Sequence, residues 1–102
     1  MKIPEKAKIG GITYRVESGT ENLYMGRMNY SGEIITSDLV IRIAPNPKER
    51  MEEDFIHELV HAAGYFMGHN DHDENLIERY AQVLYMIIKD NPDIFGDKEE
   101  GK

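Results

Sequence analysis

The first half of the chain alternates apolar and polar residues in short runs that are separated by turn signals. Residues 12–16 alternate directly after the pair Gly10-Gly11, a pattern that predicts a strand leaving a tight turn. A weaker candidate strand covers residues 23–30, and a further one covers residues 34–43. Because the turns between these runs are short, we expect antiparallel neighbours in one small sheet.

The second half of the chain changes to helical spacing. Asn46-Pro47-Lys48-Glu49 is a start signal, with Asn46 as the N-cap and proline at the first helical position. The first helix is expected to run from Pro47 to about Met67, with Gly68 as its stop. Its apolar stripe consists of Met51, Phe55, Leu59, Ala62 and Phe66.

A second helix is expected to follow a short loop. Asp73 can cap it, and the pattern continues to Lys89 or Asp90, where Asn91-Pro92 ends it. Its apolar stripe consists of Ile77, Tyr80, Ala81, Leu84 and Ile88. Two helices packed together and against a small sheet predict the α+β fold class.

Composition limits the classes of protein to consider. The 102 residues, with 40% apolar and 30% charged side chains, fit one globular domain over residues 1–95 and a disordered acidic tail over 96–102. A net charge of −7 argues against a nucleic-acid partner, and no apolar run approaches the length of a bilayer span. The chain has no cysteine, so a metal would need histidine and carboxylate ligands. We expect a cytoplasmic protein.

The candidate chemistry lies in His57-Glu58-Leu59-Val60-His61. Histidines four residues apart on a helix project from one face, so both imidazoles can bind one zinc ion. Glu58 can then reach a water on that ion and act as the general base. A shuffled chain of this composition would contain the pattern roughly 0.02 times, so two unrelated surface histidines are the weaker interpretation.

A catalytic zinc site usually has three protein ligands, so a third is needed. Met67 occupies the position where one larger class of zinc peptidases has a third histidine, which excludes that pattern. Four residues remain as candidates: His69, His72, Glu74 and Glu78. The two histidines fit solvent-facing loop residues better. Glu74 and Glu78 share a face of the second helix, and an antiparallel packing would place that face over the histidines. We therefore choose Glu74 as the third ligand.

Two supporting roles stay less determined by the sequence. Glu78 suits the group that accepts the free ring N–H of a metal-bound histidine, and Asp54 is its rival for that role. A group that stabilises the negative charge on the carbonyl oxygen should also exist. The candidates for it are Tyr65, His69, His72 and Tyr80.

At residues 55–63 and 73–81 the chain resembles small HExxH proteins of phages and prophages that are related to the ImmA/IrrE-like metallopeptidases. The resemblance implies a minimal zincin fold, in which a small antiparallel sheet leads into an active-site helix and a glutamate-bearing helix. It also implies Glu74 as a zinc ligand and Glu78 as an orienting group. The linker between His61 and Glu74 is short, and we expect no separate substrate-binding domain within these 102 residues.

The resulting hypothesis is a zinc-dependent metallopeptidase in which His57, His61 and Glu74 bind zinc and Glu58 is the general base. Its partner would be a peptide or protein substrate, bound by strand addition to an exposed strand within residues 39–43. The alternative is a non-catalytic zinc-bound interaction module, since a domain near 100 residues gains stability from a metal. A fourth protein ligand from His69 or His72 would favour that module.

Overall fold

The computed structural model of the chain describes residues 1–19 and 31–96. Its elements are four strands, β1 (Lys6–Ile9), β2 (Ile12–Ser18), β3 (Gly32–Ile35) and β4 (Val40–Ile43), followed by the helices α1 (Lys48–Phe66), α2 (Glu74–Asp90) and α3 (Pro92–Phe95). This order confirms the predicted α+β class. The candidate strand at 23–30 and the tail, apart from Gly96, lie outside the described residues.

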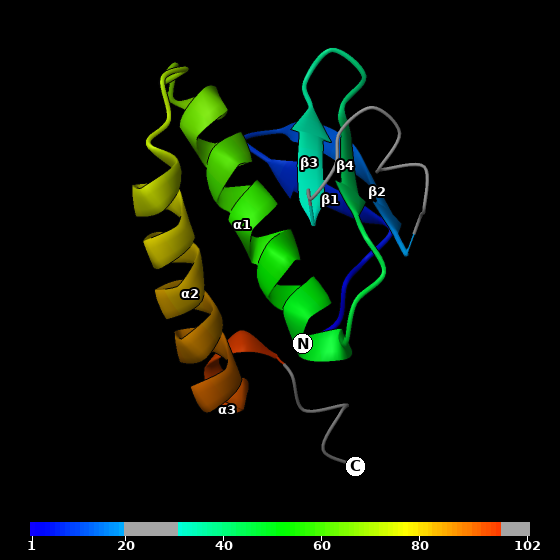
Figure 1. Cartoon of the computed structure of the whole chain (residues 1–102), viewed down its shortest axis with the longest axis vertical. Coiled ribbons are helices and arrows are strands. Elements are labelled where there is room, and N and C mark those ends of the chain that lie inside the picture. Colours follow the sequence, from blue (N-terminus) through cyan, green and yellow to red (C-terminus); the bar gives the residue numbers. More distant parts are fainter. Residues whose placement is uncertain (20–30, 97–102) are drawn as a thin grey trace.

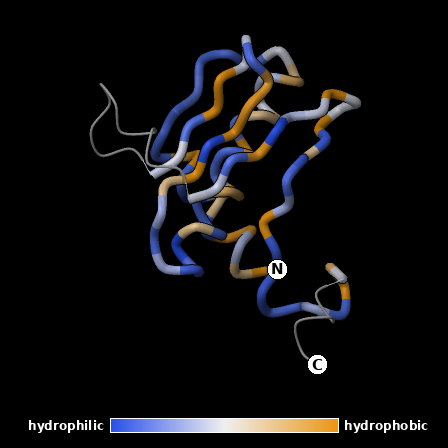
Figure 2. The backbone as a smooth tube through the Cα atoms, turned by 90° about the vertical axis from the view of Figure 1, so that its right-hand side faces the viewer, coloured by the Kyte–Doolittle hydropathy of each residue, from blue (hydrophilic) through white to orange (hydrophobic). Residues whose placement is uncertain are grey.

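The molecule is arranged in three layers, with α1 between the sheet and α2 (Figure 1). Helix α1 packs against α2 on one side and against β1, β3 and β4 on the other. The core forms where the inner faces of the strands meet this central helix, and α2 covers the far side. The hydrophobic core consists of Tyr14, Val16, Ile41, Ile43, Phe55, Ile56, Ala62 and Ala81. Seen from the sheet side, hydrophobic stretches alternate with hydrophilic ones along the strands (Figure 2).

The sheet has the order β1-β2-β4-β3 and is mixed rather than fully antiparallel. β1 and β2 form an antiparallel hairpin whose two-residue turn is Gly10-Gly11, and both glycines have positive φ, as the predicted tight turn requires. β3 and β4 are also antiparallel, whereas β2 and β4 run parallel. The expectation of antiparallel neighbours throughout is therefore wrong at this one pair, because the β3–β4 hairpin joins the sheet through its second strand.

The run at 34–43 is a hairpin and not one strand. The chain reverses between β3 and β4, where the amide of Asp38 donates to the carbonyl of Ile35 at 3.3 Å and Leu39 has a φ of 54°. Three consecutive polar residues, Thr36-Ser37-Asp38, mark this turn in the sequence, and the prediction of one continuous strand overlooked them. β4 pairs with β2 on one side and β3 on the other, so residues 39–43 cannot accept a substrate strand. The edge strand at this side is β3.

Both long helices agree with their predicted ranges to within about two residues. Asp73 caps α2, its side chain accepting hydrogen bonds from the amides of Asn75 and Leu76. The predicted cap of α1 is wrong: Pro47 is the N-cap residue, with an extended ψ of 152° and no side-chain cap hydrogen bond. Proline therefore precedes the first helical turn instead of lying within it.

The apolar stripe of α2 is only partly buried. Ala81 is fully buried and Ile88 packs against the core, whereas Tyr80 and Leu84 remain 55% and 42% exposed. The reason is that α2 packs mainly on one long helix, α1, which covers a narrower face than the stripe occupies. No helix in the described parts of the chain is long and apolar enough to cross a membrane.

Candidate metal centre

Helix α1 presents its two histidines on one face, as their four-residue spacing requires. The ring centroids of His57 and His61 are 4.9 Å apart, and both side chains are largely buried between α1 and the start of α2. Burial lowers the pKa of His61, which favours the neutral imidazole that a metal ligand needs.

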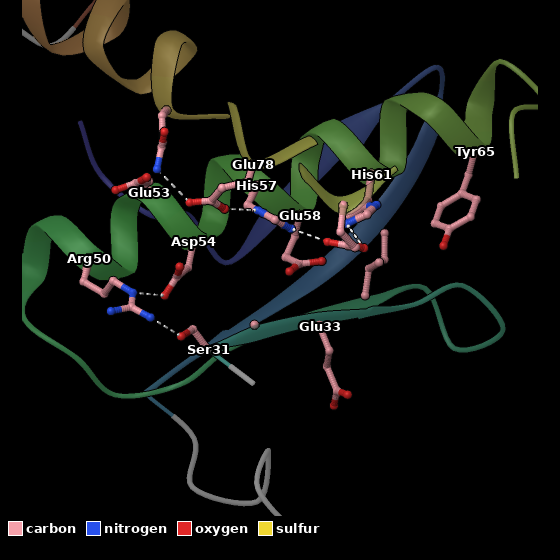
Figure 3. Close-up of a pocket in the computed structure, with 14 residues that line it drawn as sticks. Ser31, Glu33, Arg50, Glu53, Asp54, His57, Glu58, His61, Tyr65 and Glu78 are labelled. Atoms are coloured by element: carbon pink, nitrogen blue, oxygen red, sulfur yellow. Dashed lines mark hydrogen bonds and ion pairs between the residues drawn. The ribbon is translucent and has the colours of Figure 1, made fainter. Parts of the chain in front are cut away.

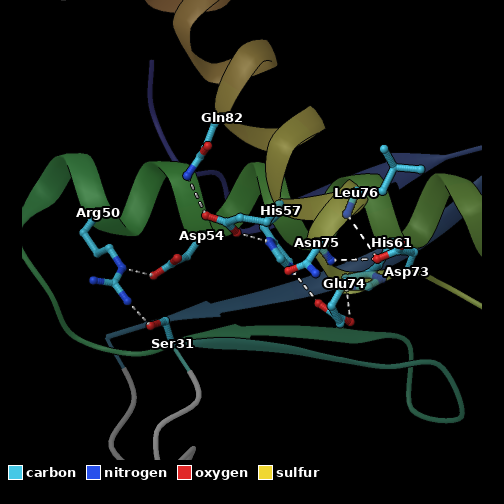
Figure 4. Close-up of polar contacts among 11 residues, drawn as sticks. Ser31, Arg50, Asp54, His57, His61, Asp73, Glu74, Asn75, Leu76 and Gln82 are labelled. Carbon is cyan, nitrogen blue, oxygen red and sulfur yellow. Dashed lines mark hydrogen bonds and ion pairs between the residues drawn. The ribbon is translucent and has the colours of Figure 1, made fainter.

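Glu74 is the first residue of α2, where the cap by Asp73 fixes the start of the helix. Its carboxylate lies across both histidines: Oε1 is 3.3 Å from Nε2 of His57, and Oε2 is 3.1 Å from Nε2 of His61 (Figure 4). One ligand atom from each of these three residues lies within 4.8 Å of the others, so the group could hold a metal ion. The structure thus brings together the three residues chosen from the sequence.

The orientation of His57 is set by the next turn of α2. Nδ1 of His57 lies 2.8 Å from Oε1 of Glu78 (Figure 3). Nε2 of Gln82 donates to the other Glu78 oxygen at 3.0 Å. A carboxylate accepts hydrogen bonds, so Nδ1 carries the proton and Nε2 of a neutral ring has a free lone pair. Asp54, the rival for this role, instead pairs with Arg50 at 3.4 Å.

The donor chemistry of the group fits a divalent cation. The free lone pair of His57 and both Glu74 oxygens converge with Nε2 of His61, and a set of acceptors facing one another is unfavourable unless a cation or proton lies between them. Imidazole and carboxylate are ligands that zinc accepts in a tetrahedral set. The residues therefore fit a divalent metal ion.

Glu58 points from α1 towards β3 (Figure 3) and is 5% exposed. The fit is close, because a Cβ at Gly32 would lie 3.1 Å from Oε2 of Glu58. Burial, together with the negative charges of Glu74, Asp54 and Glu33, raises the pKa of Glu58 to about 8. A cation at the neighbouring group would act in the opposite direction and favour the ionised carboxylate.

The metal group opens into a cavity of about 770 Å³, a size typical of ligand pockets. Residues of α1, α2 and β3 line it: Ser31, Gly32, Glu33, Ile34, Arg50, Glu53, Asp54, His57, Glu58, His61, Tyr65, Glu74, Glu78 and Gln82. The excess of carboxylates over the single arginine in this lining favours cations in the cavity. Of the four candidates for stabilising an oxyanion, Tyr65 is the one in the lining.

His69 and His72 do not belong to the group that could hold the metal. His69 is exposed, as expected for a loop residue, but His72 is not simply solvent-facing. Its Nδ1 lies 2.6 Å from Nδ1 of His61, and its Nε2 contacts the carbonyl oxygen of His69. This contact was not predicted from the sequence. The sequence feature that could have indicated it is the position of His72 directly before Asp73, because the cap fixes where the loop meets α2.

Sequence reasoning also missed the contribution of residues 31–34 to the cavity wall. Ser31 directly precedes β3 and residues 32–34 belong to it, and the position of β3 next to α1 depends on long-range pairing that no local pattern reveals. Ser31 is tied to the helix directly, since Arg50 donates a hydrogen bond to its hydroxyl oxygen at 2.7 Å (Figure 3).

Comparisons with known proteins add no relative. No protein-family model matches the chain, and no curated protein or solved structure matches it either. The likeness to small HExxH metallopeptidases therefore rests on the residues quoted for it in the sequence. The structure itself shows that His57, His61 and Glu74, on two packed helices, could hold a metal ion.

Proposed function

We propose that the protein is a zinc-dependent metallopeptidase, with His57, His61 and Glu74 as the zinc ligands and Glu58 as the general base. One observation supports the proposal: three side chains that could hold a metal ion converge in the lining of a cavity, which a buried carboxylate also lines. A metal-binding group alone needs no such carboxylate. Hydrolysis by a metal-bound water does need one, because a base must take the proton of that water.

A zinc ion in this group would supply a polarised water and a Lewis acid for the substrate carbonyl. Glu58 would take a proton from the attacking water and pass it to the leaving amine. Its environment suits that role, because burial raises the pKa of the free carboxyl to about 8, and the cation then favours ionisation.

Tyr65 is the proposed stabiliser of the oxyanion. It lies one helical turn after His61 and lines the cavity, and its ring centroid is 6.4 Å from that of His61. A phenol hydroxyl at this place can donate a hydrogen bond to a carbonyl oxygen as charge develops on it. His69, His72 and Tyr80 are outside the cavity lining, which is why Tyr65 is chosen.

The substrate would bind along β3. Within residues 1–19 and 31–96 this strand is the sheet edge, so one side of its backbone is not paired with another described strand, and residues 32–34 line the cavity next to Glu58. An extended peptide added to this edge would pass directly in front of the metal group. β3 therefore replaces residues 39–43 as the strand proposed for strand addition.

The count of candidate ligands favours the enzyme over a non-catalytic zinc module. Within residues 1–19 and 31–96, the group that could hold a metal has three members. Structural zinc sites usually have four protein ligands, whereas catalytic sites have three and an open position. Both ring nitrogens of His72 contact His61 or the backbone of His69, so His72 supports a ligand and is not a fourth one.

The test begins with zinc binding. The metal-free protein should take up one zinc ion per chain, and His57→Ala should lose most of that affinity. His69→Ala is the matched control, because it removes a nearby histidine that is outside the group. Equal zinc affinity in His57→Ala and the unchanged protein would refute the ligand assignment.

Peptidase activity needs a separate measurement. The zinc-loaded protein is incubated with a mixture of unstructured peptides, and new termini are identified by mass spectrometry. We expect cleavage that a chelator stops and added zinc restores. Zinc binding without any chelator-sensitive cleavage, over peptides of varied sequence, would favour the non-catalytic module.

A further inference from the structure

His72 contacts a proposed metal ligand through a ring-to-ring hydrogen bond. Nδ1 of His72 and Nδ1 of His61 are 2.6 Å apart, while the ring centroids are 4.9 Å apart and the planes differ by 15°. The nitrogens are much closer than the centroids, so the rings meet edge to edge and nearly in one plane. This is the geometry of an N–H···N hydrogen bond rather than of face-to-face stacking.

The direction of this hydrogen bond follows from the other side of the His72 ring. Its Nε2 contacts the carbonyl oxygen of His69, which can only accept, so Nε2 carries the proton. In a neutral His72 ring, Nδ1 is then an acceptor, and Nδ1 of His61 must be the donor. The consequence is that Nε2 of His61 has a free lone pair, and this atom is the one that faces Glu74.

Gly64 provides the space for this arrangement. It lies three residues after His61 on α1, and a Cβ at this position would be 2.7 Å from Nε2 of His72 and 3.1 Å from its Cε1. Glycine inside a helix is less stable than alanine, so its presence here calls for a reason. The close approach of the His72 ring explains why glycine is present, because any side chain at Gly64 would displace the ring.

We propose that His72 is a positioning residue that holds His61 in the tautomer and orientation required for binding the metal. It would do for His61 what Glu78 does for His57 through the 2.8 Å contact to Nδ1. The inference rests on the metal-binding part of the proposed function. One short segment then delivers both groups, since His72 and Glu74 flank the cap residue Asp73.

The tautomer of His61 can be measured without a metal. In ¹⁵N NMR spectra of the metal-free protein at a pH where both rings are neutral, we expect the His61 proton on Nδ1. We expect that preference to be lost in His72→Phe, which retains a ring but has no acceptor. A His61 ring with its proton on Nε2 in the unchanged protein would overturn the inference.

Zinc affinity provides the second readout. Removing an orienting partner of a metal-bound histidine typically weakens metal binding by about 10–100-fold, and we expect this for His72→Phe. Gly64→Ala should weaken zinc binding similarly while leaving the His72 side chain intact. His72→Gln, whose amide oxygen can accept the same hydrogen bond, should lose less, and His69→Ala should bind zinc as the unchanged protein does.

The two proposals fail in different ways. If the unchanged protein binds no zinc, the proposed function is refuted. If it binds zinc and both His72→Phe and Gly64→Ala bind it equally well, the role of His72 is refuted and the proposed function stands. Should His72→Phe not fold, Gly64→Ala and the tautomer of the unchanged protein still decide.

Discussion

Helix α1 contains two buried glutamates, of which one has hydrogen-bonding and cationic partners and the other faces further carboxylates. Glu52 and Glu58 are 2% and 5% exposed. Glu52 lies between the helices, where the Tyr85 hydroxyl donates to it at 2.6 Å and the Lys89 ammonium lies 3.6 Å away. Among the residues that the structure describes, no side chain donates a hydrogen bond to Glu58, which faces the cavity and other carboxylates.

The difference separates a structural carboxylate from a chemical one. A buried carboxylate is costly unless it is hydrogen-bonded, and Glu52 has partners from α2 that convert it into a link between the helices. Burial raises the pKa of the Tyr85 phenol, and the hydrogen bond to Glu52 raises it as well. Glu58 gains no such compensation from the fold, which is consistent with a group whose partners are a cation and a substrate.

The largest effect is expected from the matched pair Glu58→Gln and Glu52→Gln. Glu58→Gln should reduce peptide cleavage by about 10²–10⁴-fold, because the general base is lost, and should retain zinc. Glu52→Gln should leave the turnover of the folded protein unchanged and lower its stability. Both are measured by cleavage rates normalised to folded, zinc-loaded protein. Full activity in Glu58→Gln would remove the proposed distinction between the two glutamates.

The second prediction concerns stability against pH in the metal-free protein. The pKa of Glu58 is raised from 4.5 to about 8 in the folded state. Between pH 4.5 and about 8, the folded protein therefore holds a proton on Glu58 that the unfolded chain has lost. The free energy of unfolding should therefore fall as the pH rises from about 4.5 to about 8, by no more than about 5 kcal/mol.

Glu58→Gln should flatten this pH dependence, since the amide does not titrate. The measurement is urea unfolding in the presence of a chelator, at several pH values between about 5 and 8. Glu52→Gln is the control and should retain the slope of the unchanged protein. Parallel curves for Glu58→Gln and the unchanged protein would show that Glu58 does not carry the effect.

Tyr85→Phe tests the structural glutamate with a smaller change. It removes the hydroxyl that donates to Glu52 and keeps the ring, so a buried carboxylate loses its closest partner. We expect a loss of about 1–3 kcal/mol in the free energy of unfolding. Zinc affinity should not change, because Tyr85 is outside the metal group. A stability equal to that of the unchanged protein would mean that this hydrogen bond does not link the helices.

Lys89→Met should have the smallest effect. The ammonium lies 3.6 Å from Glu52 but its side chain is 35% exposed, so water screens the ion pair. We expect a loss of about 0.2–1 kcal/mol, measured by the same urea unfolding. A larger loss than in Tyr85→Phe would reverse the order of the two partners and make the lysine the main support of Glu52.

The sequence by itself determined what depends on neighbouring residues in the chain. The spacing of His57 and His61 places them on one helical face, and Asp73 caps α2 with a side chain that reaches only its own first turn. The Gly10-Gly11 turn and the extents of both long helices were predictable for the same reason. Each depends on backbone geometry within a few residues.

Only the tertiary structure decided which distant groups meet. The sequence placed Glu74 on the face of the second helix that could turn towards the histidines, but only the packing of α2 on α1 brings its carboxylate to both of them. The same packing brings His72 to Nδ1 of His61. The order of strands, which buries β4 and leaves β3 at the edge beside Glu58, also depends on long-range pairing. Helical periodicity fixes where a side chain points on its own element, whereas its partner is chosen by packing across the whole chain.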